Sequence, residues 1–309
     1  MNAPARAPTA PDRAPLPTAA PGWTRPESGI GIVGSGAMGV ALAETYARAG
    51  LDVLVVASRA TSADAAQARL TRSLAGAVRR GRLSEAQSEQ TMLRIAFTSD
   101  LTELADRRLV IEAVPEIEEL KLDIFAVLDK VVQDDTAVLA SNTSSIPITR
   151  LARVAVRPER IVGLHFFNPV PAMPLVEVTG GMHTSEATIR RAHSFVEDEL
   201  GKQAVRSRDR AGFVVNALLI PYLLNAARMV EAGFATADDI DRGMTLGCGH
   251  PMGPLSLCDL IGLDVVNDVA HALYDEFRTP DHAPPPLLLR MVEAGLLGRK
   301  TGRGFFEYA

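Results

Sequence analysis

A glycine-rich turn between an apolar run and a helical run is the feature that most constrains how this chain folds. Residues 30–34 are a short apolar run typical of a buried strand. Residues 37–49 have a helical pattern that Gly50 closes, and residues 53–57 form a second apolar run. A strand, a helix and a strand of these lengths predict a right-handed βαβ unit.

The turn itself has the pattern G-x-G-x-x-G, from Gly34 to Gly39, after a predicted strand and at the start of a predicted helix. Its first glycine permits a tight turn, its second lets the backbone approach a pyrophosphate, and its third permits close packing of helix on strand. The alternative is an ordinary strand–helix turn, but the flanking pattern favours a dinucleotide site. The candidate cofactor-binding residues here are Gly34, Gly36, Ala37, Met38 and Gly39.

The end of the second strand indicates which nicotinamide cofactor binds. An NAD site usually has Asp or Glu there, bound to the ribose 2′-hydroxyl. This chain has Ala57, Ser58 and Arg59 instead. A hydroxyl group and a guanidinium suit a 2′-phosphate, so the sequence favours NADP over NAD. The alternative is that Arg59 is a solvated loop charge and that NAD binds through other contacts.

The rest of the chain predicts an α/β class and two domains. Apolar runs alternate with helical patterns as far as about residue 208, which predicts a Rossmann-type domain over residues 28–208 with a mostly parallel sheet. Only helical patterns follow, which predicts an all-helical domain over residues 209–309. The expected strands are 109–114, 137–140, 161–166 and 174–178, and the expected helices are 64–80, 117–132, 185–200, 213–231, 237–244 and 264–277.

Composition excludes several classes of function. The 309 residues are 47% hydrophobic, which supports a sizeable core, and the net charge of −5 does not favour nucleic acid as a partner. No apolar stretch approaches the roughly 20 residues of a membrane span. Two cysteines and no His/Cys cluster with metal spacing favour a metal-free protein in the reducing cytoplasm. The Pro/Ala-rich residues 1–27 are expected to be a disordered leader.

A histidine and a glutamate form the candidate acid–base pair. His165 lies near the end of a predicted strand, and Glu177 follows twelve residues later inside another apolar strand. A lone histidine is usually structural, and a glutamate in an apolar run is costly unless it is paired. If the two pair, Glu177 orients the imidazole and leaves its other nitrogen to act on a substrate.

Six motifs in a fixed order give the chain a family resemblance. The longest, at 165–178, is H-F-F-N-P-V-P-A-M-P-L-V-E-V; the others are I-E-A-V-P-E, S-N-T-S-S, G-F-V-V-N, H-P-M-G-P-L and K-T-G-R-G-F, starting at 111, 141, 212, 250 and 300. With them the chain resembles the L-3-hydroxyacyl-CoA dehydrogenases over roughly residues 29–308.

The resemblance implies a role for each matching residue. His165 is the general acid and base that moves the hydroxyl proton, and Glu177 is its electrostatic partner. Ser144 touches the substrate oxygen and the nicotinamide region, and Asn216 fixes the reacting oxygen across the domain cleft. Further residues match positions that contact the cofactor: Glu116, Lys121, Asn142, Asn168 and Lys300.

Most of these residues also have a plain structural alternative. Ser144 and its neighbour Ser145 could cap the helix expected near residue 148, and Asn216 could be a buried helix residue. Glu116 and Lys121 could be a helix surface pair, and Lys300 could be a solvated loop charge.

The implied reaction interconverts an (S)-3-hydroxyacyl-CoA, with hydroxybutyryl as the first choice, and the 3-oxoacyl-CoA. Arg69, Arg72 and Arg79 lie where the family contacts CoA. The alternatives are a substrate bound to an acyl carrier protein, a sugar acid, or a non-catalytic relative like the lens crystallins. The resemblance also implies a homodimer formed through the helical domain, with the apolar helix at 213–232 as the candidate interface.

Overall fold

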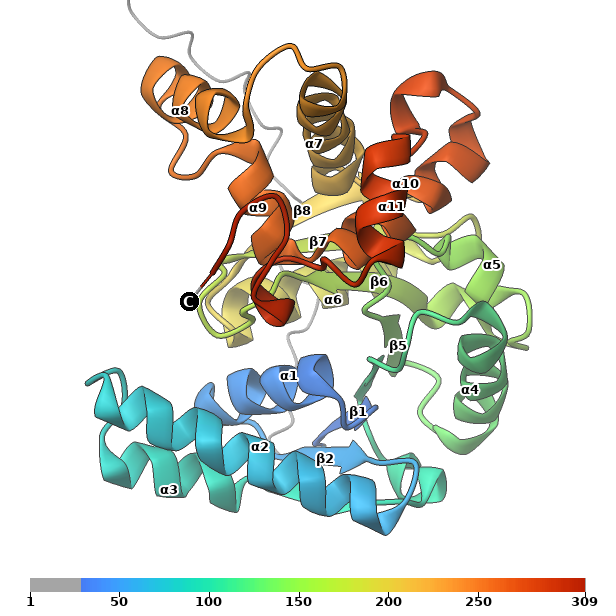
Figure 1. The fold of residues 1–309 in the computed structure, drawn as a ribbon. Helices are drawn as coiled ribbons and strands as arrows, with labels where there is room; N and C mark the ends of the chain where they lie inside the picture. Colours follow the sequence, from blue (N-terminus) through green and yellow to red (C-terminus); the bar gives the residue numbers. More distant parts are fainter. Residues whose placement is uncertain (1–28, 309) are drawn as a thin grey trace, which may run out of the picture.

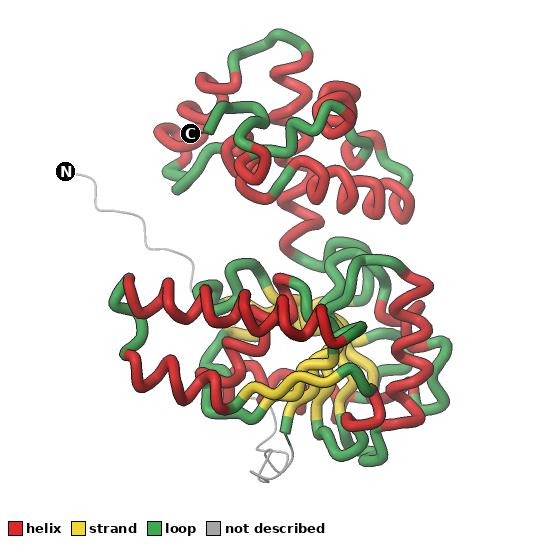
Figure 2. The backbone as a smooth tube through the Cα atoms, turned by 60° about the horizontal axis from the view of Figure 1, so that its bottom comes forward, coloured by secondary structure: helices red, strands yellow, loops and turns green. Residues whose placement is uncertain are grey.

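The computed structural model describes residues 29–308, so the predicted leader at 1–27 lies outside the described residues. An eight-stranded sheet with helices on both faces makes up the N-terminal part, and helices alone make up the C-terminal part (Figures 1 and 2). The predicted fold class is confirmed.

The sheet has the strand order β3-β2-β1-β4-β5-β6-β7-β8. Every neighbouring pair is parallel except β6 and β7, which are antiparallel. The strands are β1 (Ile30–Val33), β2 (Val53–Val56), β3 (Ile95–Thr98), β4 (Leu109–Glu112), β5 (Val138–Ser141), β6 (Ile161–Phe166), β7 (Leu175–Gly180) and β8 (Gln203–Arg208).

Helices cover both faces of this sheet, which is why its central strands are apolar throughout. One face packs on Leu42 and Tyr46 from α1 and on Phe195 after α6, and the other packs on Phe125 from α4 and Leu151 from α5. The helices of this part are α1 (Ala37–Arg48), α2 (Ala60–Arg79), α3 (Glu85–Leu93), α4 (Glu118–Val131), α5 (Ile148–Ala152) and α6 (Glu186–Ser194), which continues as a π-helical turn (Phe195–Glu199).

The helical part has a core of its own. Leu223 and Leu224 from α7 pack with Leu263, Val266 and Leu273 from α10, and all five are fully buried. Its helices are α7 (Val215–Glu231), α8 (Ala237–Cys248), α9 (Pro254–Ile261), α10 (Leu263–Phe277) and α11 (Pro286–Glu293). Among the described residues, no helix has the length and apolarity that crossing a membrane requires.

The expected strands and long helices are present, with small shifts at their ends, but shorter elements were not anticipated. β8 has the sequence Gln-Ala-Val-Arg-Ser-Arg and is largely exposed, so it lacks the apolar signal of the central strands. β8 forms a strand because it pairs with β7, although its composition has little strand signal. The elements that the sequence pattern did not reveal are β3, β8, α3, α9 and α11, whereas α5 begins where a helix was expected, near residue 148.

Candidate active site

The predicted acid–base pair spans the antiparallel strands β6 and β7. The register places His165 directly opposite Glu177, and Nδ1 of His165 lies 2.7 Å from Oε2 of Glu177. Glu177 is fully buried and only 7% of His165 is exposed. With Nδ1 bound to the carboxylate, Nε2 is the ring nitrogen left for a substrate. The geometry therefore suits a histidine that exchanges one proton with a bound molecule.

Glu177 also holds the first turn of the helical part. Its Oε1 accepts hydrogen bonds from the backbone N–H groups of Val214 and Val215, each at 2.9 Å. Asn216 is the second residue of α7. Because a carboxylate at a helix N-terminus satisfies unpaired N–H groups and is favoured by the helix dipole, Glu177 fixes Asn216 relative to His165.

A cavity of about 680 Å³ brings the predicted catalytic side chains together. His165 lines it from β6, Ser144 from the loop after β5, and Asn216 from α7. Asn142 and Asn168 also face this cavity. Much of the remaining wall consists of apolar side chains of the helical part, including Leu219, Ile220, Leu257, Leu260, Ile261 and Val265.

Glu116 holds the S-N-T-S-S loop in which Ser144 lies. Its Oε1 accepts hydrogen bonds from the backbone N–H groups of Ser144 and Ser145, at 3.1 and 3.3 Å, and from the hydroxyl groups of Thr143 and Ser145. The helix α5 has Pro147 at its N-cap and no side-chain cap hydrogen bond. The serines therefore do not cap that helix, and the capping alternative is wrong.

A buried ammonium lies beneath this loop. Lys121 is 1% exposed, and its Nζ lies 2.7 and 2.9 Å from the carboxylate oxygens of Glu112 and 3.1 Å from Oε2 of Glu116. Glu112, which is fully buried, also accepts a hydrogen bond from the hydroxyl of Ser141 at 2.7 Å. The alternative of a helix surface pair is therefore wrong, because Lys121 is buried and Glu116 precedes α4.

The pKa of Glu116 reflects this setting. Burial raises the pKa of the carboxyl group, but the charge of Lys121 and the hydrogen bonds from Thr143, Lys121 and Ser145 outweigh burial and hold the pKa below its ordinary value. The carboxylate therefore stays ionised and continues to accept its hydrogen bonds in neutral and mildly acidic solution.

A second cavity, of about 790 Å³, lies over the glycine-rich turn. Gly34, Gly36, Ala37 and Met38 line it, together with Ser58 at the end of β2. It shares Met38, Ala113 and Val114 with the first cavity, so the two adjoin. Gly39 instead packs against the turn, since a Cβ there would lie 1.9 Å from the carbonyl oxygen of Gly34.

Besides Gly39 and Glu177, which lie behind the cavity walls, two predicted cations line neither cavity. Arg59 is exposed at the N-cap of α2. Lys300 binds Asp264 of α10 through two contacts of 2.5 Å. Neither cation is therefore part of the cavity walls, although Arg59 directly follows Ser58, which is.

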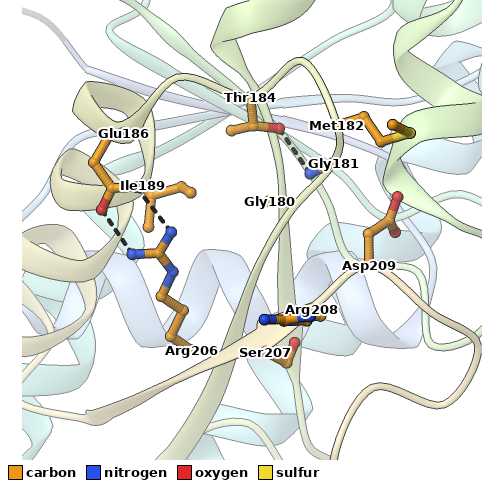
Figure 3. Close-up of a pocket in the computed structure, with 10 residues that line it drawn as sticks. All are labelled: Gly180, Gly181, Met182, Thr184, Glu186, Ile189, Arg206, Ser207, Arg208 and Asp209. Atoms are coloured by element: carbon orange, nitrogen blue, oxygen red, sulfur yellow. Dashed lines mark hydrogen bonds and ion pairs between the residues drawn. The ribbon is translucent and has the colours of Figure 1, made fainter.

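A third cavity, of about 620 Å³, lies where β7 and β8 end (Figure 3). Because β7 is antiparallel to β6, its last residue Gly180 pairs with Val162 near the start of β6, away from the glycine-rich turn. Arg206 in its wall forms two hydrogen bonds with Glu186, at 2.6 and 2.8 Å (Figure 3). No predicted site residue lines this cavity.

Models of one protein family match both parts of the chain. The NAD binding domain of 3-hydroxyacyl-CoA dehydrogenase matches residues 29–210, and the C-terminal domain of 3-hydroxyacyl-CoA dehydrogenase matches residues 212–308. The chain belongs to the 3-hydroxyacyl-CoA dehydrogenase family.

Individual relatives support the same assignment. A 3-hydroxybutyryl-CoA dehydrogenase of Mycobacterium tuberculosis is 53% identical over 279 residues, which cover 90% of this chain and 98% of the relative. The mitochondrial hydroxyacyl-coenzyme A dehydrogenase of Homo sapiens is 36% identical, with 90% of each chain covered. The crystal structure of M. tuberculosis FadB2 superposes with a TM-score of 0.90 at 53% identity, covering 91% of this chain and 99% of that one. The prediction of a dehydrogenase of this family is confirmed, and the alternative functions gain no support.

One part of the candidate site was not anticipated from the sequence: the pair Glu112 and Ser141 beneath Lys121. The signal was present, because Glu112 is an acidic residue inside the apolar run at 109–114. Like Glu177, a carboxylate in such a run is costly to bury unless it is paired.

Proposed function

We propose that this chain is a 3-hydroxybutyryl-CoA dehydrogenase that prefers NADP and acts on the thioester through His165, Glu177, Ser144 and Asn216. The main support is that His165, Ser144 and Asn216 face one cavity that adjoins the glycine-rich turn. The names of the relatives, which act on 3-hydroxybutyryl-CoA or hydroxyacyl-CoA, support the choice of substrate.

The residues around the turn suit a dinucleotide. Gly36 is the N-cap of α1 and makes no side-chain cap hydrogen bond, so the first backbone N–H groups of α1 have no side-chain partner there. A Cβ at Gly36 would meet no atom within 4 Å, which leaves room for a ligand above the turn. Free N–H groups at a helix N-terminus are a favourable site for a pyrophosphate.

The side chains can then perform the proton chemistry. A bound nicotinamide cofactor would supply the exchange of a hydride with C3 of the substrate. Nε2 of His165 takes the hydroxyl proton in the oxidative direction and returns it in the reductive direction. Glu177 stabilises the imidazolium formed in between, and Ser144 and Asn216 hold the reacting oxygen in place.

The preference for NADP is supported at the end of β2. Ala57 and Ser58 line the nucleotide cavity where an NAD enzyme has a carboxylate, and none of the described residues that line it carries a negative charge that would repel a 2′-phosphate. Arg59 follows and is exposed. We expect Arg59→Asp to weaken binding of NADPH far more than binding of NADH.

The proposal also extends to the CoA carrier, the oligomeric state and the cellular compartment. Arg72 and Arg79 are exposed on α2, where they are available to the phosphates of CoA. We also propose a homodimer formed through the helical part, because this part exposes bulky apolar residues: Leu218, Phe234 and Leu246 are 74%, 78% and 79% exposed. Both cysteines are free, which suits the cytoplasm.

The test is an absorbance assay of the purified protein with acetoacetyl-CoA, run in parallel with NADPH and with NADH. Faster turnover with NADPH supports both the reaction and the cofactor preference. Turnover with NADH alone supports the assignment as a dehydrogenase and refutes the preference for NADP. Undiminished turnover by His165→Ala would refute the mechanism.

A further inference from the structure

Arg69 reaches the glycine-rich turn from a different helix. Its Nη1 donates a hydrogen bond to the carbonyl oxygen of Ser35 at 3.2 Å, although the two residues are 34 positions apart in the chain. Ser35 is the second residue of the turn and lines the nucleotide cavity. The guanidinium therefore lies at the rim of that cavity.

The packing of α2 on α1 holds Arg69 in this place. On either side of it, Ala66 and Leu70 are fully buried and pack with Val40 of α1. One turn further along, the hydroxyl of Ser73 donates a 2.6 Å hydrogen bond to Glu44 of α1, whose side chain is almost fully buried. Figure 1 shows α2 running beside α1 at the bottom of the molecule.

Among the described residues, no acidic side chain neutralises the charge of Arg69. A guanidinium has five N–H donors, and the carbonyl of Ser35 occupies one of them. Within residues 29–308, no carboxylate forms an ion pair with Arg69. The first turn of α1 also contains no acidic residue. Two positive groups, the guanidinium and the N-terminus of α1, thus face the same turn, which favours an anion between them.

We propose that Arg69 binds a phosphate group of the dinucleotide cofactor, with its position set by the carbonyl of Ser35. The inference rests on the proposed function, in which the cavity over the turn holds the cofactor. The phosphate is either the pyrophosphate, which NADH and NADPH share, or the 2′-phosphate, which NADPH alone has. Both groups present phosphate oxygens to the guanidinium, and the experiment below distinguishes the pyrophosphate from the 2′-phosphate.

The experiment measures the dissociation constants of NADH and NADPH from the fluorescence of the reduced nicotinamide, without any thioester. We expect Arg69→Ala to raise the Kd by about tenfold, the effect of losing one charge-assisted hydrogen bond. An equal rise for both cofactors identifies the pyrophosphate, and a rise for NADPH alone identifies the 2′-phosphate. Arg69→Lys keeps the charge without the planar fork, so its Kd should lie between those of the wild type and Arg69→Ala.

Arg82→Ala is the matched control, because it removes the same charge beyond the end of α2, away from the turn. Its Kd should stay within twofold of the wild type for both cofactors. An unchanged Kd in Arg69→Ala would overturn the proposal, whether or not the KM for acetoacetyl-CoA rises. If the wild type binds neither cofactor, the proposed function itself fails. Melting temperatures of the variants show whether each one is folded.

Discussion

Replacing Glu177 with glutamine separates the two tasks of its carboxylate. One oxygen binds Nδ1 of His165 and the other accepts two backbone N–H groups of the first turn of α7. Glutamine has a single acceptor oxygen and an NH2 group that can only donate. The change keeps the size of the side chain but cannot satisfy both neighbours.

Each orientation of the glutamine has a cost. If its NH2 group faces His165, Nδ1 must accept and the ring proton moves to Nε2, so the histidine can no longer take the hydroxyl proton. If its NH2 group faces α7, three buried donors meet without an acceptor. In the transition state, where the imidazolium would lose its charged partner, these costs amount to about 3–4 kcal/mol, which is a roughly 10²–10³-fold loss of kcat/KM.

The assay is the kcat/KM for acetoacetyl-CoA at saturating NADPH. We expect Glu177→Gln to lower it by that factor, mainly through kcat, and to lower the free energy of unfolding by about 1–2 kcal/mol. His165→Asn is the control, because its side-chain N–H replaces Nδ1 and keeps Glu177 paired. It should lose activity with little change in stability. A kcat/KM for Glu177→Gln within fivefold of the wild type would refute this account of the pair.

The remaining predictions concern the loop, the turn and the surface. The pKa of Glu116 is depressed in the folded state, so the stabilising effect of its carboxylate is complete above about pH 4.5 and is lost as the pH falls through the folded-state pKa. The unfolding free energies of the wild type and Glu116→Gln should therefore differ at pH 6 and converge in acid. A difference that stays constant with pH would contradict this. Gly39→Ala should destabilise the fold by about 1–3 kcal/mol because its Cβ would lie 1.9 Å from a backbone oxygen. Gly36→Ala has open space and should keep its melting temperature while its Kd for the cofactor rises. If Leu218 or Phe234 lies in a dimer interface, a change to glutamate should yield monomers by light scattering, and an unchanged mass would remove that residue from the interface.

Local patterns were enough to predict the first strand–helix–strand unit and its glycine-rich turn. The strand, turn and helix at 30–49 depend on neighbours in sequence: an apolar run, glycines at fixed positions and a helical pattern. The pairing of His165 with Glu177 was also predictable, because a glutamate inside an apolar strand requires a partner. Edge strand β8 was not predictable in this way, because it is polar and is held by β7.

The sequence by itself therefore determined the central strands, the long helices, the order of the motifs and the residue types that the chemistry requires. The tertiary structure alone decided which of those residues share a surface: it placed Asn216 beside His165 through Glu177, buried Lys121 between two carboxylates, and left Lys300 with Asp264. The physical reason is that propensity and periodicity act over one or two turns of chain. Contacts between distant residues depend on strand register and on how helices pack, which no local pattern specifies.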